Sequence, residues 1–242
     1  DTDGGTLYVS DANGNLITSA TFPACKERVS YARTTDAGDT WAETAYPTPG
    51  YTNVKSTFST SQLAAPVVDQ GSQLFSSSLS VQVTIPTGAT LRYTTDGTLP
   101  TLTNGTTSAT GKFTVSLTTN YRFRLFQDGS LPSNVTTRSY LLRNKDYALP
   151  VISVMGDPNF LYSDSLGVMV QGKNGVAGNG KAYPCNWNME WDRPVNFSYL
   201  TADGQMALNQ DVNLEMCGGW SRAFTPHSFK LKGDKELGGN KN

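Results

Sequence analysis

The amino-acid sequence predicts an all-β protein composed of β-sandwich modules in tandem. Within residues 79–125, apolar side chains occupy every second position in four short runs, which is the period of a strand that buries one face. Turn-forming residues separate these runs. Charged residues make up 16% of the chain, against about 25% in an average globular domain, which suits short strands joined by tight turns. The alternating apolar residues are Leu79, Val81, Val83, Ile85, Leu91, Tyr93, Phe113, Val115, Leu117, Tyr121, Phe123 and Leu125, and the turn residues are Pro86, Gly88, Asp96, Gly97 and Asn120.

Length and charge exclude several classes of protein. A chain of 242 residues predicts one or two domains at about 150 residues each, or three if the modules are small. The 19 basic and 20 acidic residues nearly cancel and form no Lys/Arg-rich run, so we expect no nucleic-acid partner. No apolar run reaches the roughly 18 residues that a spanning helix needs, so we expect no membrane span.

The three cysteines, Cys25, Cys185 and Cys217, leave two alternatives open. Their spacing fits no CxxC zinc site and their number is odd, so we predict no metal site and no complete disulfide framework. Free and mostly buried thiols agree with the usual burial of cysteine. A bridge between Cys185 and Cys217 is the alternative.

Residues 1–57 begin with a predicted β-hairpin. The apolar stretches at 7–9 and 16–17 flank the turn Asp-Ala-Asn-Gly-Asn at 11–15, and Asn-Gly readily adopts the positive φ angles of tight hairpin turns. The motifs Ser-Tyr-x-Arg at 30–33, Trp at 41 and Pro-Thr-Pro-Gly-x-x-Asn at 47–53 follow.

In this order, these motifs resemble the last part of a lamin-tail-like domain. The resemblance implies an Ig-like sandwich of the kind found in secreted, modular bacterial proteins. The opening strands of that family are absent, and a sandwich that lacks strands exposes its core face and its unpaired edges. We therefore expect that the chain is a truncated piece, or that another segment completes the sheet.

Residues 58–145 contain the predicted central module. The sequence Tyr-Thr-Thr-Asp-Gly-Thr-Leu-Pro-Thr at 93–101, followed by the motifs at 116–119 and 122–126, resembles the fibronectin III-like module at the C-terminus of bacterial chitobiases and hexosaminidases. The resemblance covers residues 63–142 and implies one complete β-sandwich. The polar stretch before it, Val54–Ala65, is a linker or a connecting edge strand.

Residues 146–242 contain a third predicted unit, which is β-rich. Residues 149–155 begin a new element, and Asp157-Pro158 predicts one short helical turn, because Asp is a favoured N-cap and proline suits the first helical position. Residues 172–180 form a loop rich in glycine and asparagine. This loop is either a plain surface loop or a phosphate cradle, although its spacing matches neither a P-loop nor GxGxxG.

Five motifs in this unit resemble the N-terminal part of the CotH family, the atypical protein kinases first associated with bacterial spore coats. The resemblance covers residues 147–242 and implies a partial kinase-like N-terminal lobe. The motifs are Leu-Pro-Val-Ile-Ser-Val at 149–154, Asp-Pro-Asn-Phe-Leu at 157–161, Trp-Asp-Arg-Pro-Val at 191–195, Gly-Gly-Trp-Ser-Arg at 218–222 and Ser-Phe-Lys-Leu-Lys at 228–232.

By their position in these motifs, Ser221, Arg222 and Lys230 are the phosphate contacts that the CotH resemblance implies. Phosphoryl transfer depends on positioning and on neutralising charge at the transferred group. His227 departs from the family, which often has lysine before the Ser-Phe pair. We predict no catalytic residue here, because the chain stops before the family's acidic elements. For Arg222 and Lys230, the alternative is a solvated charge at a strand end.

A binding role is the competing interpretation, because aromatic side chains are numerous enough to form platforms for sugars, although aromatics in sandwiches mostly lie in the core. The candidates are Trp41, Trp187, Trp191, Trp220, Tyr31, Tyr46, Tyr51 and Tyr183.

These motifs predict a fragment of a secreted or cell-surface bacterial modular protein of the CotH kinase-like family. Its β modules are expected to serve as spacers or binding units. The longer parent protein is expected to phosphorylate extracellular proteins with ATP and Mg²⁺. We expect no cofactor in this chain alone. The expected partners are an extracellular protein or glycan and the missing flanking segments of the same polypeptide. The alternative is a non-enzymatic cell-surface module that binds glycans or proteins.

Overall fold

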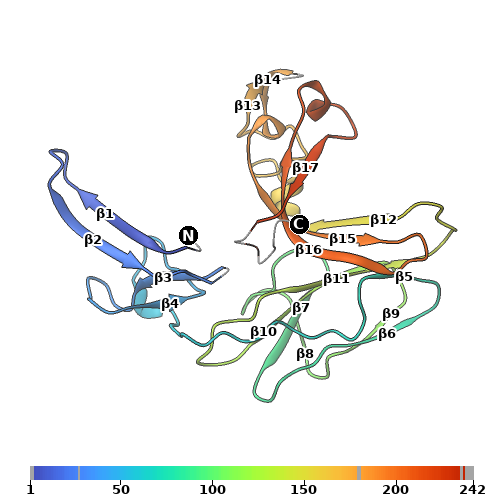
Figure 1. The fold of residues 1–242 in the computed structure, drawn as a ribbon, viewed down its shortest axis with the longest axis horizontal. Helices are drawn as coiled ribbons and strands as arrows, with labels where there is room; N and C mark the ends of the chain where they lie inside the picture. Colours follow the sequence, from blue (N-terminus) through green and yellow to red (C-terminus); the bar gives the residue numbers. More distant parts are fainter. Residues whose placement is uncertain (1–2, 27, 179–180, 235–236, 238–242) are drawn as a thin grey trace.

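A computed structural model of the chain describes residues 3–26, 28–178, 181–234 and 237. The predicted all-β class is confirmed, because these residues form strands β1–β17 and a single α-helix, α1. Figure 1 shows the strands arranged in several small sheets. No helix in the described part has the length and hydropathy that a membrane span requires.

Two hairpins form the N-terminal part. β1 (Gly5–Ser10) pairs antiparallel with β2 (Leu16–Phe22), and β3 (Ser30–Arg33) pairs antiparallel with β4 (Trp41–Thr44). The predicted first turn is confirmed: the Asp11 carboxylate accepts the backbone N–H groups at 13 and 15, at 2.9 and 2.8 Å, and φ at Gly14 is 85°.

The first hairpin leaves its large apolar side chains in solvent. Leu7, Tyr8, Val9, Leu16 and Ile17 are each between 43% and 65% exposed. Several large apolar side chains are therefore exposed together on this hairpin.

The segment that leads from the N-terminal part into the central module is extended and runs along the edge of that module. After the 3₁₀ turn Asn53–Lys55, single bridges join Phe58 to Thr44 and Gln62 to Leu131. The Ser59 hydroxyl also donates to the Gly129 carbonyl at 2.9 Å. The stretch predicted as a linker or edge strand therefore contacts both neighbours.

The central module is a sandwich of two sheets. The larger sheet has the order β5 (Gln73–Phe75), β11 (Thr136–Leu142), β10 (Thr119–Phe126), β7 (Thr90–Thr94) and β8 (Thr106–Ser108). The smaller sheet pairs β6 (Leu79–Gln82) with β9 (Lys112–Val115).

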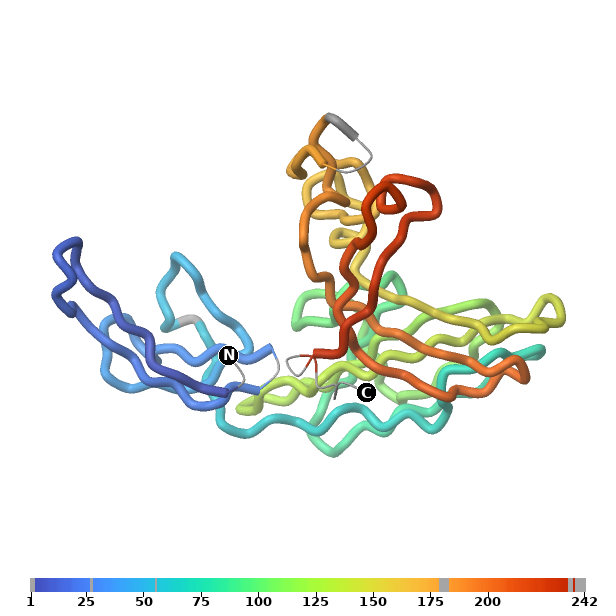
Figure 2. Tube along the Cα trace, turned by 45° about the horizontal axis from the view of Figure 1, so that its top comes forward, coloured from blue at the N-terminus to red at the C-terminus, as the bar shows by residue number. Residues whose placement is uncertain are grey.

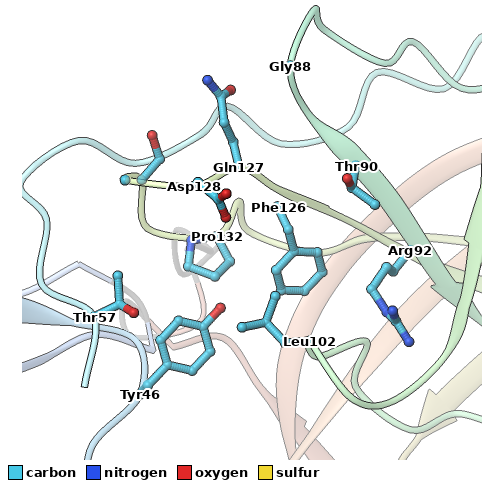
Figure 3. Close-up of a pocket in the computed structure, with 12 residues that line it drawn as sticks. Tyr46, Thr57, Gly88, Thr90, Arg92, Leu102, Phe126, Gln127, Asp128 and Pro132 are labelled. Carbon is cyan, nitrogen blue, oxygen red and sulfur yellow. The ribbon is translucent and has the colours of Figure 1, made fainter. Parts of the chain in front are cut away.

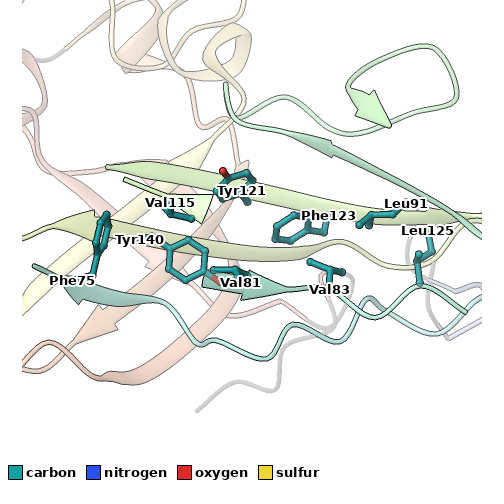
Figure 4. Packing of buried hydrophobic residues seen from close by; sticks show 9 residues of the cluster. All are labelled: Phe75, Val81, Val83, Leu91, Val115, Tyr121, Phe123, Leu125 and Tyr140. Atoms are coloured by element: carbon teal, nitrogen blue, oxygen red, sulfur yellow. The ribbon is translucent and has the colours of Figure 1, made fainter. Parts of the chain in front are cut away.

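The predicted alternation places the core of this sandwich correctly. Val83, Leu91, Phe123 and Tyr140 are fully buried between the two sheets (Figure 4), and the rings of Tyr121 and Phe123 stack with centroids 5.2 Å apart. Aromatic side chains of this size supply much of the stabilising apolar burial. Leu117, which we also placed in the alternating set, is 68% exposed, because β9 ends at Val115.

The prediction that β10 buries one face was wrong. Arg122 and Arg124 alternate with the core residues of β10, yet they are only 9% and 7% exposed. Arg122 Nη1 donates to the Gly97 carbonyl at 2.8 Å, and Arg124 Nε donates to the Ser133 carbonyl at 2.8 Å. The loop after β7 and the loop between β10 and β11 cover this second face, and their backbone carbonyls accept hydrogen bonds from the buried guanidinium groups.

This loop, residues 95–104, contains most of the sequence motif at 93–101. The Asp96 carboxylate accepts both the backbone N–H and the hydroxyl of Thr98, at 2.9 and 2.6 Å, and the hydroxyl bond is the main cause of the lowered pKa of Asp96. The Asn104 side chain donates to the Leu99 carbonyl at 2.9 Å. The motif therefore encodes a loop that is rigid through its own side chains.

The C-terminal part contains a sheet of four strands in the order β12 (Val151–Gly156), β15 (Arg193–Leu200), β16 (Met206–Met216) and β17 (Phe229–Lys232). The predicted helical turn is confirmed as α1 (Pro158–Tyr162) with Asp157 as its N-cap. The predicted glycine loop contains β13 (Val176–Gly178), which pairs with β14 (Lys181–Cys185), and its residues 179 and 180 lie outside the described part.

A second apolar core supports this part. Val168, Cys185, Leu214 and Met216 are at most 1% exposed within it, and Trp187 packs among them. All three cysteines are free thiols, of which Cys185 alone is buried. The alternative bridge between Cys185 and Cys217 is therefore not formed in the structure.

The C-terminal sheet packs against the β5 and β11 side of the sandwich through small polar groups (Figures 1 and 2). The Ser139 and Ser153 hydroxyls lie 2.9 Å apart, and the Ser72 hydroxyl lies 3.3 Å from that of Ser198. Ser72, Ser139 and Ser198 are fully buried, so these hydrogen bonds connect the two parts without water between them.

Ion pairs hold the last strand to its neighbour. Glu215 on β16 lies 3.1 Å from Lys230 and 2.6 Å from Lys232, and Lys232 also lies 2.6 Å from Asp192. The hydrogen bond from Lys232 is the largest cause that lowers the pKa of Glu215 below its ordinary value of 4.5. The bonds to Asp192 and then Glu215 raise the pKa of Lys232 above 10.5.

Replacing Gly97 by alanine tests the contact between the motif loop and the C-terminal part. A Cβ at Gly97 would lie 2.3 Å from the Gly156 carbonyl oxygen, and φ is +87°. We expect Gly97→Ala to destabilise the protein by roughly 2–5 kcal/mol, which combines backbone strain with overpacking. The measurement is urea denaturation.

Gly129→Ala is the matched control, because its φ is +74° and no atom lies within 4 Å of the added Cβ. It carries the backbone strain alone, about 1–2 kcal/mol. Equal destabilisation by the two variants would contradict a close contact at Gly97.

Replacing Glu215 by glutamine tests the ion pairs through their pH dependence. A carboxylate with a lowered pKa in the folded state stabilises the fold above its unfolded pKa, and the effect is lost as the pH falls through the folded pKa. We expect Glu215→Gln to lower the free energy of unfolding at pH 7 by about 1 kcal/mol at most, because both lysines are partly exposed and water screens the pairs. At pH 3 and below, the difference from the natural protein should shrink.

The control for this variant is Glu190→Gln, which changes an exposed carboxylate that has no ion pair within the described residues. It should leave the free energy of unfolding unchanged at both pH values. If Glu215→Gln lowered the free energy of unfolding by the same amount down to pH 2, the effect would come from packing and not from charge.

Candidate functional site

The structure places the three predicted phosphate contacts at the end of the C-terminal part. Ser221 and Arg222 lie in the 3₁₀ helix Trp220–Ala223, and Lys230 lies in β17. The Ser228 N–H bonds to the Ser221 carbonyl at 3.4 Å, which ties this turn to the start of β17.

The surroundings of these residues resemble a solvated strand end. The Lys230 side chain is 50% exposed and is paired with Glu215, so a phosphate would have to compete with that carboxylate. Arg222 Nε donates to the Gly218 carbonyl within the same turn. A nucleotide-binding role for these three residues stays a prediction.

The aromatic candidates fall into different environments. Trp187 is 7% exposed and packs in the second core with the His227 ring 5.1 Å away, so it offers no surface to a ligand. Trp220 is 66% exposed, and Tyr51 is 83% exposed. Tyr31 and Trp41 stack on each other beside a hollow of about 380 Å³ between the two N-terminal hairpins.

Tyr46 lies in a cleft of about 460 Å³ at the junction of the N-terminal part and the sandwich (Figure 3). One wall comes from the segment after β4, and the other comes from β7, the end of β10 and the turn that follows. The residues that line the cleft are Tyr46, Thr57, Gly88, Thr90, Arg92, Leu102, Phe126, Gln127, Asp128, Gly129, Ser130 and Pro132.

Tyr46, Leu102 and Pro132 line the apolar part of the cleft, whereas Phe126, at 5% exposed, adds little accessible surface. Figure 3 shows the rings of Tyr46 and Phe126 around one space, with Leu102 beside them. The Arg124 guanidinium lies 5.6 Å from the centre of the Phe126 ring, which fixes the ring from behind. Burial raises the pKa of Tyr46, against the opposing effect of Arg124, so its hydroxyl is a proton donor at neutral pH.

Polar side chains complete the rim. Gln127 and Asp128 are exposed on the turn after β10, which is closed by the Ser130 N–H bond to the Gln127 carbonyl at 3.2 Å. Arg92 is held by bonds to the Asn104 and Gly105 carbonyls, at 3.3 and 2.6 Å. Its guanidinium is therefore fixed in place and presents positive charge along one wall.

This lining is suited to binding and not to acid–base or nucleophilic chemistry. Among the described residues that form it, Asp128 is the single carboxylate, and there is no histidine or cysteine. Nor do the described residues of the chain contain a group of three or more His, Cys, Asp or Glu side chains that would hold a metal ion. Aromatic faces beside amide and carboxylate groups bind ligands that are apolar on one side and rich in hydroxyls at the edge.

Sequence reasoning identified Tyr46 as a candidate but missed the rest of this cleft. Its walls come from residues 46–57, 88–102 and 126–132, which no local motif connects. The available signal was the Gln-Asp-Gly turn at 127–129, which follows a strand.

Residues 68–137 match the family model of the Chitobiase/beta-hexosaminidase C-terminal domain. No curated protein and no solved structure matches the chain. The match lies within the stretch that we expected to resemble this module, and it confirms that part of the sequence interpretation. The resemblances to CotH kinases and to lamin-tail domains stay predictions. The matched residues include β7, β10 and the turn after β10, which form one wall of the cleft.

Proposed function

We propose that this chain is a carbohydrate-associated β module whose cleft binds a glycan outside the cell. The cleft beside Tyr46 is the observation that carries the proposal, since it joins an aromatic ring and the Leu102 side chain to the Asp128 carboxylate and the Gln127 amide. The matched family supports it, because the name of the family associates the domain with enzymes that act on chitin-type sugars.

The chemistry of the lining favours an oligosaccharide over other ligands. The C–H face of a sugar ring packs on an aromatic face, and its hydroxyls bond to planar polar side chains at the edge. An anionic ligand would meet Asp128 at the rim, and a purely apolar ligand would leave the rim groups without partners. About 460 Å³ is within the range of sites that enclose small ligands, so the cleft has room for a short oligosaccharide.

The rigid framework of the module suits such a role. Phe126 lies at the end of β10, and the turn with Asp128 is held by Ser59 through the Gly129 carbonyl. Binding groups that are fixed before the ligand arrives lose less conformational entropy on binding. The β modules then act as spacers that present a preformed cleft.

Binding is tested by a glycan array and by calorimetry with N,N′-diacetylchitobiose, cellobiose and xylobiose. We expect Asp128→Asn to weaken binding of the best oligosaccharide by about 10- to 100-fold, the usual effect of a lost charged hydrogen bond. Tyr46→Ala should weaken it by at least about tenfold, because it removes one aromatic face.

Trp220→Ala is the matched control, since it removes an exposed aromatic side chain far along the chain from the cleft. It should leave the affinity unchanged. Loss of binding with Trp220→Ala and not with Tyr46→Ala would move the site to the C-terminal part, and absence of binding to any glycan on the array would overturn the proposal.

A further inference from the structure

The β1–β2 hairpin projects from the N-terminal part of the molecule as a ribbon of two strands (Figures 1 and 2). Within the part of the chain that the structure describes, β1 and β2 pair only with each other. Every residue of β1 is exposed. The outer edge of β1 therefore presents backbone N–H and C=O groups to solvent, as the edge strand of any open sheet does.

The hairpin is apolar on both of its faces. The Thr6 and Thr21 hydroxyls lie 3.0 Å apart across the two strands, so these two side chains share one face. Tyr8 lies on that face as well, because every second side chain of a strand points the same way. Leu7, on the opposite face, lines the hollow beside Trp41. An antiparallel sheet that meets solvent normally has one polar face, so a ribbon with two apolar faces is suited to contact with another protein surface.

The exposed apolar surface of the hairpin is of the size found at interaction sites. Its five large apolar side chains, each 43–65% exposed, leave several hundred Å² in solvent, and the largest patch on a typical monomer is about 300–600 Å². A two-stranded ribbon without a third strand is also only marginally stable in water. A partner that pairs with the hairpin would therefore stabilise it.

Charge and edge geometry identify the kind of partner. β1 (Gly-Thr-Leu-Tyr-Val-Ser) and β2 (Leu-Ile-Thr-Ser-Ala-Thr-Phe) contain no charged residue and no proline, the residues that commonly protect an edge strand from pairing. The one irregularity of the pairing leaves Ile17 of β2 without an opposite residue, so the backbone of β1 stays regular. A charged strand would find no opposite charge here. A second β1 strand is neutral, has an equally free edge and carries the same apolar side chains.

We propose that two copies of the chain associate through β1, antiparallel about a two-fold axis, to form a four-stranded sheet in the order β2–β1–β1–β2. The same edge is used by both copies, so the contact is closed at two. Leu7, Tyr8 and Val9 each gain cross-strand neighbours from the second copy, and aromatic and β-branched pairs stabilise antiparallel sheets. A contact of this kind falls below about 1,200 Å² in total, the range of weak interfaces, so we expect a micromolar dissociation constant.

Tyr8→Lys tests the pairing in sedimentation velocity runs over a concentration series from about 1 to 100 µM, which spans micromolar affinity. The natural chain should sediment increasingly as a dimer. We expect Tyr8→Lys to raise the dissociation constant at least about tenfold, because the two-fold axis brings both lysines into one short strand pair and a lysine on an edge strand opposes pairing.

Tyr162→Lys is the matched control, because Tyr162 is 62% exposed, against 65% for Tyr8, and lies in α1 of the C-terminal part. It should dimerise as the natural chain does. A natural chain that stays monomeric over the whole series would assign the hairpin surface to a different polypeptide and overturn the proposal. Equal dissociation constants for Tyr8→Lys and the natural chain, or assemblies larger than two copies, would overturn it as well.

Hydrogen exchange of the natural chain provides a readout that needs no variant. Pairing protects the N–H groups on the outer edge of β1, so exchange of β1 amides should slow as the concentration rises through the dissociation constant. Exchange in β17, which lies in the C-terminal sheet, should not change with concentration. Dimer formation without concentration-dependent protection of β1 would place the contact elsewhere and contradict the proposal.

Discussion

The fold of the central module depends on hydrogen bonds between two buried arginines and backbone carbonyls. Arg122 and Arg124 lie on the face of β10 opposite the apolar core, and they bind the carbonyls of Gly97 and Ser133. Burying a guanidinium costs free energy unless hydrogen bonds compensate, so these bonds favour one conformation of the loops that supply the carbonyls. β10 is therefore buried on both faces, by aromatic packing on one and by a polar shell on the other.

The same arginines link the core to the proposed binding cleft and to the C-terminal part. Arg124 lies behind the Phe126 ring that forms one wall of the cleft. Arg122 anchors the loop at Gly97, which meets the Gly156 carbonyl at the end of β12. A change at Arg122 or Arg124 would therefore alter both the cleft and the packing of the C-terminal sheet. A change in the N-terminal hairpin would affect neither contact.

Local chemistry made part of this structure predictable from the sequence. The Asn-Gly turn of the first hairpin, the Asp157 cap and the alternating core of β6, β7, β9 and β10 each depend on residues close together in the chain. The burial of Arg122 and Arg124 was not predictable, because arginine between apolar residues ordinarily marks a solvent face. The cleft was missed for a related reason, since Tyr46 and Asp128 come together only through tertiary packing.

The cleft and the interface between the sandwich and the C-terminal sheet differ in how their polar groups are satisfied. The groups at the rim of the cleft are in contact with water, so an empty cleft costs the fold little. At the interface, the buried hydroxyls of Ser72, Ser139 and Ser198 are hydrogen-bonded to protein groups. A buried hydroxyl without a partner would lower the stability of the folded state, so these bonds are what allows a polar contact between the two parts.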